Sequence, residues 1–440
     1  MKLKTVYACQ SCGYQTGKWL GRCPSCNEWN TFAEDVINVG KADTIGGASG
    51  ASAVRHTRLG PLEKPQKIAL SAPTQERIKT GLIELDTVLG GGIAESSLIL
   101  LSGEPGIGKS TLTLQIVDLI AAQNRSVLYI TGEEAISQIA DRARRLGLTQ
   151  TNISLLYETC VENILTAVAN EKPHFLVVDS IQVLSSQEIA GSAGSISQVR
   201  FATELLMNEI KSRKIPLLLI GHVNKEGSIA GPKVLEHLVD TVLILEGERD
   251  HELRLLRVLK NRFGPVNEVG LFEMTATGMR ELKNPGERIL DMQPRGAVGS
   301  ALTITMEGNR PLLMEVQALT NRTNFGYPKR MAEGFDRNRL ELLAAVISRH
   351  TSFDLQSMDI YVNITGGLSL SDPAGDSAVC AAIISSVTGR PLPAGAVFFG
   401  EVGLTGEIRP SFKDPARLKA AEKMGLKRCG NVKRLEEMMK

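Results

Sequence analysis

The chain of 440 residues is too long for one hydrophobic core, so two or three domains are expected. Its net charge of +2 excludes nucleic-acid binding by a global positive field and leaves only local patches for that role. No run reaches the roughly 18 uncharged apolar residues of a membrane helix, and the N-terminus lacks the apolar core of a signal peptide. These features predict a cytoplasmic protein with no membrane partner.

Four cysteines near the N-terminus form two pairs, Cys9-x-x-Cys12 and Cys23-x-x-Cys26. Each pair makes a tight knuckle, and two knuckles complete the tetrahedron of thiolates that Zn²⁺ prefers. A redox pair of CxxC motifs and an iron–sulfur site are the alternatives. The sequence therefore predicts a zinc-binding module over residues 1–36, with a structural or docking role because four protein ligands close the site. A flexible linker rich in Gly, Ala, Ser and Lys follows over 37–70.

Residues 71–283 read as strands that alternate with helices. Strands are expected at 97–101, 126–131, 175–179 and 215–221, helices after 111 and at 135–146 and 197–213, and a terminal hairpin at 241–246 and 253–260. This alternation predicts an α/β domain with a mostly parallel sheet and helices on both faces.

The turn between the first strand and the first helix of this domain carries the pattern G-x-x-x-x-G-K-S. Its glycines let backbone N–H groups converge on phosphate oxygens, and the helix N-terminus adds a partial positive charge. Lys109 would lie near the β- and γ-phosphates and Ser110 would bind Mg²⁺. The predicted site for ATP and Mg²⁺ comprises Gly103, Glu104, Pro105, Gly106, Ile107, Gly108, Lys109, Ser110 and Thr111.

Three further strand ends carry polar candidates. Asp179 ends an apolar strand and would hold Mg²⁺ through water, although many parallel strands end in an Asp that only caps a helix. Glu133 and Glu134 follow the second strand, and either could orient the attacking water; the alternative is that they are solvated residues at a helix start. His222 follows the fourth strand and could sense the γ-phosphate, unless it is a histidine satisfied near the sheet.

Two loops leave the same edge of the predicted sheet, over 185–198 and 224–232. In a ring they would line the centre, where backbone N–H groups, hydroxyls and Lys225 could hold a phosphodiester strand. The alternative is an ordinary surface loop in each place.

The zinc module, the phosphate loop, Asp179 and the run Lys260-Asn261-Arg262-Phe263-Gly264 together resemble the bacterial RadA (Sms) family, over essentially the whole chain. The run 237–242 also looks like the pattern of that family. The resemblance implies a RecA-like ATPase core that assembles into a homo-hexameric ring. It further implies a role in recombinational DNA repair, in which ATP hydrolysis drives branch migration or unwinding of single-stranded or branched DNA. A recombinase or replication partner would fit that role.

The resemblance also implies a role for Lys260 and Arg262, which would reach the nucleotide of a neighbouring subunit. A cation supplied from outside stabilises charge on the transferring phosphoryl group. The alternative is a basic turn that contacts DNA or is merely solvated. With this pair, the predicted catalytic residues are Lys109, Glu133, Asp179, Lys260 and Arg262.

Residues 284–440 read as a separate α+β domain that resembles the proteolytic domain of Lon, through 366–367, 372–373 and 400–406. Lon-type peptidases use a Ser–Lys dyad, with the Lys as base for the Ser. Ala374 stands where the Ser is expected and Arg417 where the Lys is expected, and neither can perform that chemistry. Peptidase activity is therefore not expected, although Ser371 or Ser377 would serve in a shifted register.

The C-terminal domain also holds a basic segment with two aromatic residues. Arg322, Lys329 and Arg330 bracket Phe325 and Tyr327. Basic residues interleaved with aromatic ones can contact phosphates and stack on bases, so we predict DNA contact here. A solvated charged face is the alternative.

Three functions remain in competition at this point. The first is a DNA-dependent ATPase motor, the second is an ATP-dependent peptidase of the Lon type, and the third is a RecA-like signalling ATPase. Ala374 and Arg417 argue against the second. The four cysteines and the run 260–264 argue against the third.

Overall fold

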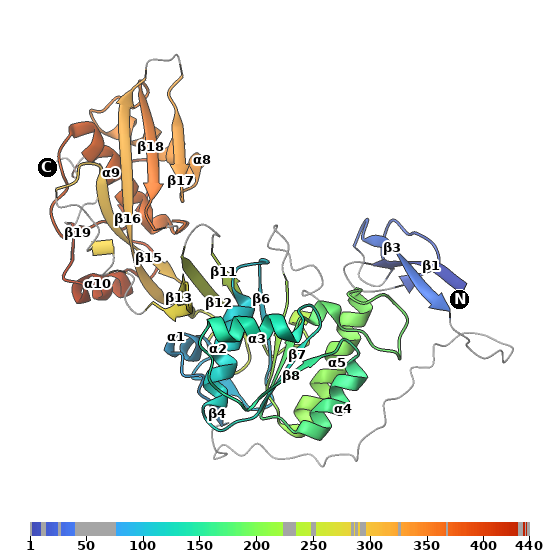
Figure 1. The fold of residues 1–440 in the computed structure, drawn as a ribbon. Coiled ribbons are helices and arrows are strands. Elements are labelled where there is room, and N and C mark those ends of the chain that lie inside the picture. Colours follow the sequence, from blue (N-terminus) through green and yellow to red (C-terminus); the bar gives the residue numbers. More distant parts are fainter. Residues whose placement is uncertain are drawn as a thin grey trace, which may run out of the picture.

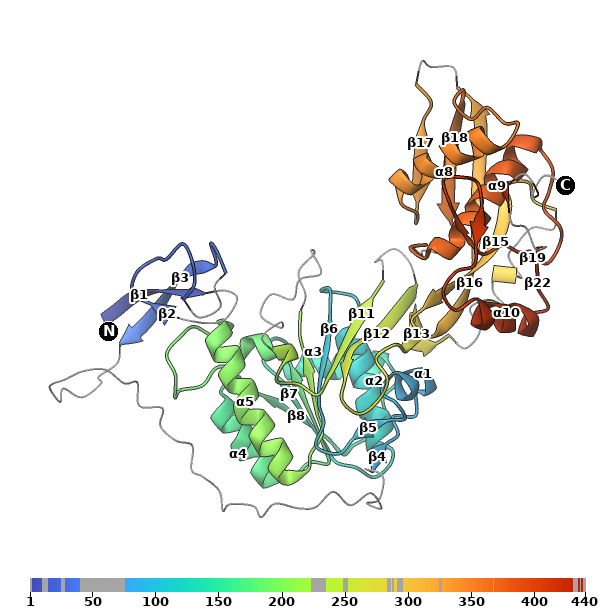
Figure 2. The ribbon, with the colours of Figure 1, turned by 180° about the vertical axis from the view of Figure 1, so that it is seen from behind.

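The fold is taken from a computed structural model (Figures 1 and 2), which describes residues 2–9, 15–24, 28–39, 76–222, 235–247, 252–282, 286, 289–290, 296–323, 327–366, 368–429, 434–435 and 437. Cys12, Cys26 and Lys225 lie outside these residues, as does nearly all of the expected linker. The described ranges form three principal sheets of three, nine and six strands. None of the helices in these ranges is long and apolar enough to cross a bilayer.

The N-terminal module is a three-stranded antiparallel sheet in the order β2-β1-β3. Its strands are β1 (Lys2–Cys9), β2 (Gln15–Thr16) and β3 (Phe32–Val39). The register runs from Lys2 opposite Val39 to Cys9 opposite Phe32, so the first cysteine lies at the end of the ladder. Because β3 continues to Val39, the folded module extends slightly past the expected boundary at 36.

The nine-stranded sheet has the order β14-β13-β12-β11-β6-β10-β9-β7-β8. Its strands are β6 (Leu98–Gly103), β7 (Val127–Thr131), β8 (Ile153–Tyr157), β9 (Phe175–Asp179), β10 (Leu217–Ile220), β11 (Thr241–Glu246), β12 (Leu253–Asn261), β13 (Val269–Thr275) and β14 (Gly278–Glu281). The strands from β11 to β8 are parallel, and β12, β13 and β14 extend the sheet in antiparallel fashion. The prediction of a mostly parallel sheet is confirmed.

Helices cover both faces of this sheet (Figure 1). They are α1 (Ile83–Val88), α2 (Lys109–Ala121), α3 (Ile136–Arg145), α4 (Val161–Glu171), α5 (Ile196–Arg213) and the short η1 (Ile181–Val183). Because successive side chains of a strand point to opposite faces, Ile99 and Leu101 of β6 pack into the core under α1, α2 and α3, whereas Leu98 and Leu100 pack into the core under α4 and α5. A small hairpin of β4 (Arg77–Ile78) and β5 (Ile93–Ala94) precedes the sheet.

Several elements of this domain were not expected from the sequence; besides the short β4, α1, β5 and η1 they are β8, α4, β13 and β14. Both β8 and β14 are edge strands of the sheet, so each is only partly covered. In β8 the residues are half-buried or exposed, which hides the apolar run that marks a buried strand.

The C-terminal domain is a six-stranded mixed sheet in the order β17-β18-β16-β15-β19-β22, with α8 and α9 packed on one face and α10 on part of the other. Its elements are β15 (Ser300–Glu307), β16 (Arg310–Arg322), β17 (Arg330–Glu333), α8 (Arg337–His350), β18 (Met358–Ile364), η2 (Pro373–Gly375), α9 (Asp376–Thr388), β19 (Ala396–Val397), β20 (Glu401–Val402), β21 (Ile408–Arg409), α10 (Asp414–Lys423) and β22 (Lys427–Arg428). Strands β20 and β21 form a separate two-stranded ladder.

The turn of the β15–β16 hairpin contacts the ATPase domain. Arg310 donates to the carboxylate of the buried Glu84 in α1, and Asn309 Nδ2 donates to Glu268 Oε1 at 3.1 Å. Leu312 packs with Val269 and Leu271 in a small apolar cluster. The two domains therefore share both polar and apolar contacts at this hairpin.

Candidate active site

The phosphate loop joins the end of β6 to the start of α2. Gly103, Gly106 and Gly108 have positive φ values of 157°, 83° and 113°, a conformation that glycine adopts readily. A side chain at Gly103 would also place its Cβ 2.5 Å from the carbonyl oxygen of Leu245 in the adjacent strand β11. The loop can therefore curl around a ligand only because these positions lack a side chain.

Lys109 is the first residue of α2 and is almost fully buried. Its Nζ donates to the backbone carbonyls of Gly103 at 2.8 Å and Glu104 at 2.9 Å. Burial lowers the pKa of Lys109 to about 8, although the nearby carboxylates of Asp179 and Glu133 act in the opposite direction. The ammonium is thus held within the loop, at the position predicted for the phosphate-binding lysine.

Asp179 lies beside the phosphate loop, at the end of β9. Its Oδ2 accepts hydrogen bonds from Ser110 Oγ at 2.9 Å and from the hydroxyl of Tyr129 at 2.7 Å. Burial raises the pKa of Asp179, and the two donors offset part of that rise. Ser110 and Asp179 therefore meet as expected of a pair that shares a magnesium ion, and their hard oxygen donors suit that cation.

Glu133 and Glu134 follow β7 but have different surroundings. The Glu133 carboxylate accepts a hydrogen bond from Ser180 and lies 3.5 Å from His222 Nε2. His222 and Ser180 hold the pKa of Glu133 below its ordinary value. Glu134 instead forms an ion pair with Arg142 at 2.9 Å. Both carboxylates act on Asp179, but only Glu133 also acts on Lys109, whereas Glu134 is paired with Arg142.

Tyr129 and His222 also contact the acidic residues of this neighbourhood. The hydroxyl of Tyr129 reaches Asp179 from the adjacent strand β7, a role that the sequence analysis missed. The only signal for it was a tyrosine in an otherwise aliphatic strand. His222 Nδ1 is buried, and within the described residues it has no hydrogen-bond partner. Its other nitrogen faces Glu133, so His222 lies where a sensor of the nucleotide is expected.

The turn 260–264 lies at the opposite edge of the sheet from the phosphate loop. Thr241 pairs with Asn261 and with Ile99 at this edge, whereas Leu245 pairs with Gly103 at the other. Lys260 Nζ donates to the carbonyls of Glu236 and Val239, and Arg262 Nη1 donates to Asp240 Oδ1 at 3.1 Å.

Asp240 and Arg77 anchor that turn. Asp240 is buried, and its Oδ2 accepts from the N–H of Leu98 at 3.1 Å, so it ties the turn to the start of β6. Arg77 donates to the carbonyl of Phe263 at 2.5 Å. The backbone of the turn is therefore held firmly, although the side chain of Arg262 is half exposed to solvent.

In the N-terminal module, Cys9 and Cys23 are both fully buried and pack with Phe32 in one small cluster. They come from different CxxC knuckles, so the fold brings the two knuckles together as a four-thiolate site requires. Cys9 Sγ lies 3.1 Å from Thr31 Oγ1, which can support the sulfur as a neighbouring hydrogen-bond partner. These residues fit a zinc ion.

The C-terminal domain holds a buried ion pair at the place expected for a Ser–Lys dyad. Ala374 is fully buried and Arg417 is 2% exposed. Asp372 joins them, because one carboxylate oxygen accepts from the Ala374 N–H at 3.0 Å and the other accepts from Arg417. Arg417 also donates to the carbonyls of Ile304 and Phe412. The guanidinium is thus committed to structural partners.

In the part of the C-terminal domain that the structure describes, neither serine of the shifted register is hydrogen-bonded to a basic side chain. Ser371 is exposed, and Ser377 Oγ is buried without a hydrogen-bond partner in the described part of the chain.

The loop over 185–198 and the basic segment of the C-terminal domain are partly ordered by internal contacts. The buried amide of Gln198 bonds to Ser186, Ile189 and Gly191, which organises the first half of the loop. Arg330 donates to the carbonyls of Leu355 and Met358, which favours a structural role for this residue. Arg322 and Lys329, by contrast, are exposed.

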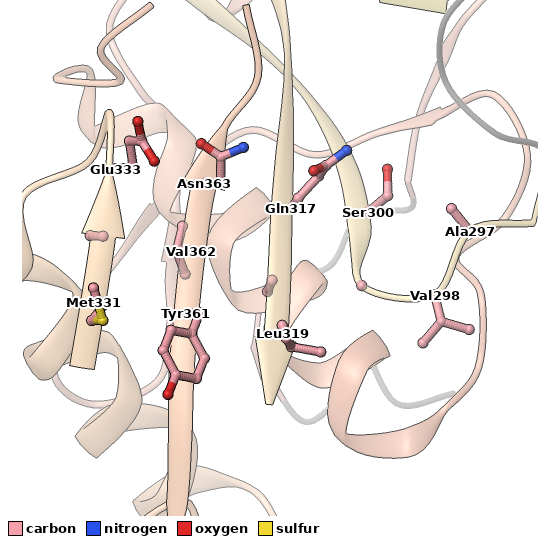
Figure 3. Close-up of a pocket in the computed structure, with 13 residues that line it drawn as sticks. Ala297, Val298, Ser300, Gln317, Leu319, Met331, Glu333, Tyr361, Val362 and Asn363 are labelled. Carbon is pink, nitrogen blue, oxygen red and sulfur yellow. The ribbon is translucent and has the colours of Figure 1, made fainter. Parts of the chain in front are cut away.

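A hollow lies away from all of these residues, on the face of the C-terminal sheet opposite to α8 and α9. It measures about 590 Å³. Met331, Tyr361 and Leu319 are register partners on β17, β18 and β16 and form an apolar row across it (Figure 3). Gln317 and Asn363 lie beside that row, without an arrangement that suggests catalysis.

Comparison with known proteins places these sites in context. The rubredoxin metal-binding domain matches residues 7–34, which contain all four N-terminal cysteines, and the KaiC ATPase family matches residues 78–155, which contain the phosphate loop. The DNA repair protein RadA of Bacillus subtilis is 46% identical and that of Pseudomonas aeruginosa is 42% identical to this chain. Each match covers 97% of this chain and 92% of the relative.

Proposed function

Because the chain belongs to the bacterial RadA family of DNA repair proteins, we propose that it is a DNA-dependent ATPase that drives branch migration or unwinding of single-stranded or branched DNA in recombinational repair. The family membership and the RecA-like ATPase domain are the premises of this proposal. The chemistry of the motor and its assembly into a homo-hexameric ring in the cytoplasm are inferred.

In the proposed site, the phosphate loop binds ATP. Backbone N–H groups between Gly103 and Ser110 would cradle the phosphates, and Lys109 would turn from its carbonyl partners to phosphate oxygens. Ser110 and Asp179 would hold Mg²⁺, which neutralises charge on the phosphates when bound. Glu133 would orient and deprotonate the attacking water, since its lowered pKa keeps it ionised as a base.

The proposal of a ring rests on one observation: within one chain, the phosphate loop and the basic turn 260–264 lie far apart. Ile99, next to the turn 260–264, and Gly103 in the phosphate loop are four positions apart on β6, a span of about 13 Å along the strand. The cations of that turn therefore face away from the nucleotide of their own chain. Lys260 and Arg262 are proposed to act on the nucleotide of the next subunit, which requires a head-to-tail interface that closes into a ring.

DNA would be held by the loops at the carboxyl edge of the sheet, with Lys225, and by Arg322 and Lys329 of the C-terminal domain. For Arg330 the donation to two backbone carbonyls supports the structural alternative better. The Zn²⁺ held by Cys9, Cys12, Cys23 and Cys26 is proposed to stabilise a docking module for a recombinase or replication partner.

The Lon-type peptidase is not favoured, because the buried Arg417 is bonded to Asp372 and Ala374 offers no nucleophile. The test of the proposal is ATP turnover by the full chain with and without single-stranded DNA. Turnover is expected to rise when DNA is added. A rate that DNA leaves unchanged would remove the main support for a DNA motor.

A further inference from the structure

A second hollow, of about 420 Å³, lies at the edge of the nine-stranded sheet where the parallel strands begin, opposite to the edge that holds the phosphate loop. We call it the amino-edge hollow. Its floor includes the buried apolar residues Pro173 and Ile215, which lie two residues before the first residues of β9 and β10. Helices α4 and α5 run side by side to this edge (Figure 2).

The rim of the amino-edge hollow is basic. It carries Arg125, Lys172, Arg213 and Lys214, with Glu95 as the only acid of its described lining. Arg213 forms an ion pair with Glu209 of its own helix. The other three cations form neither an ion pair nor a side-chain hydrogen bond with any residue of the described ranges. Three unpaired cations thus surround one apolar floor, in a protein whose net charge is only +2.

The backbone at this rim gives an independent observation. Lys172 and Lys214 are the C-cap residues of α4 and α5, and they have positive φ values of 47° and 58°. Asn124, which directly precedes Arg125, has a φ of 59°. Glycine is the residue that adopts this conformation without cost, and a lysine there is strained. Strained residues that cluster around one hollow point to a function of their side chains.

Compensation of the helix dipole is the ordinary explanation for a basic residue at a helix C-terminus. It does not require the strained position, because a lysine anywhere in the last turn would serve. In α5 the last turn already contains Lys211 and Arg213, so Lys214 is not needed for that purpose. Compensation of the helix dipole therefore does not explain why a lysine occupies position 214.

We propose that the amino-edge hollow binds the phosphodiester backbone of DNA, with Arg125, Lys172 and Lys214 on the phosphates. Unpaired ammonium and guanidinium groups bind phosphate and release its counterions, and the apolar floor can accommodate a sugar. The identification of DNA as the polyanion uses the membership of the chain in a DNA repair family. This contact lies at the opposite edge of the sheet from the loops proposed above, so it is a second DNA site.

The test uses the full chain with Lys172→Gly and Lys214→Gly combined. Binding of a labelled oligonucleotide, either single-stranded or duplex, is measured over a range of NaCl concentrations. Each lost phosphate contact lowers the slope of log affinity against log salt by about 0.7 for single strands and about 0.9 for duplexes. The double variant should therefore show a slope smaller by about 1.4 or about 1.8, respectively. Because glycine relieves the strain, its unfolding midpoint should stay equal or rise.

The matched control is Lys419→Gln with Lys423→Gln, which removes two exposed positive charges from α10 of the C-terminal domain. It should keep the salt slope of the unaltered chain. An unchanged slope in the glycine variant, or an equal loss in the control, would overturn the proposal. ATP turnover without DNA should be the same in all three proteins. If the proposed second DNA site is wrong, the proposed nucleotide chemistry is therefore unaffected.

A second measurement separates DNA from a free nucleotide as the occupant. In a Lys109→Ala background, which weakens the phosphate loop, binding of ADP is measured with and without the two glycine substitutions. The proposal predicts no difference. Residual ADP binding that the glycine substitutions remove would show that the hollow takes a free nucleotide, and the assignment to DNA would fall.

Discussion

The nucleotide site and the buried pair Asp372–Arg417 differ in what they leave available to a ligand. Each combines a carboxylate and a basic side chain that are largely withdrawn from water. Within the described residues Lys109 donates to two uncharged carbonyls, which it can exchange for phosphate oxygens. Arg417 donates to a carboxylate and to two carbonyls on separate segments, and exchange would leave an ion buried without a partner.

The two sites therefore differ in the free-energy cost of breaking the bonds of the basic side chain, which is small at the nucleotide site and large at the Asp372–Arg417 pair. Removal of one member of a buried ion pair leaves an uncompensated charge, at a cost of about 3–5 kcal/mol. Exchange of a neutral acceptor for a phosphate oxygen carries no such penalty. We therefore expect substitutions at the first site to affect activity and substitutions at the second to affect stability.

The largest effect is expected for Arg417→Met, which removes the charge and keeps an apolar stem of similar length. It should lower the free energy of unfolding of the C-terminal domain by about 3–5 kcal/mol, because Asp372 stays buried without its cation. Urea unfolding followed by circular dichroism measures this. Adding Asp372→Asn should restore part of the loss, since it removes one stranded charge but also one acceptor for the N–H groups of Ala374 and Met306. A single variant as stable as the unaltered chain would show that the pair is not structural.

The next effect is expected at Lys109. Lys109→Ala should lower ATP turnover by at least about a hundredfold, since one preorganised charge stabiliser near the transferring phosphoryl is lost. The unfolding midpoint should change little, because burial already disfavours the Lys109 charge, as its lowered pKa of about 8 indicates. Lys109→Met serves as a control that keeps the stem packed. A large loss of stability with modest loss of turnover would reverse the contrast between the two sites.

The smallest effect is expected for Tyr129→Phe, which removes one donor to Asp179 and keeps the buried ring. A hydrogen bond to a charged group contributes about 1.5–3 kcal/mol, so turnover should fall roughly ten- to a hundredfold at low Mg²⁺. A higher Mg²⁺ concentration should restore part of the lost turnover if the hydroxyl positions the metal-binding carboxylate. Turnover measured as a function of Mg²⁺ concentration tests this role. An equal loss at every Mg²⁺ concentration would assign the hydroxyl to packing alone.

The phosphate loop and Asp179 were predictable because their signal is local. The glycine spacing, the lysine and the flanking strand and helix are all contained within a short segment, and Asp179 ends an unbroken apolar strand. The alternation of strands and helices likewise predicted a parallel sheet before its strand order was known. The family resemblance rested on motifs of the same local kind.

The partners of those residues were not predictable, because they depend on register and on long-range contacts. Tyr129 reaches Asp179 only because β7 and β9 are neighbours with Thr131 opposite Asp179. Asp240 holds Arg262 across 22 residues of chain. Arg330 was expected at DNA from its basic surroundings, yet its guanidinium meets carbonyls 25 and 28 residues away.

The most direct test of the account mixes two inactive proteins, Lys109→Ala and Arg262→Ala. If Arg262 of one subunit completes the nucleotide site of its neighbour, a mixed ring contains interfaces in which Lys109 and Arg262 are both intact. Random mixing in equal amounts makes about a quarter of the interfaces complete. DNA-stimulated ATP turnover should therefore recover to about a quarter of the unaltered rate. A mixture no more active than the two variants measured separately would contradict catalysis between subunits.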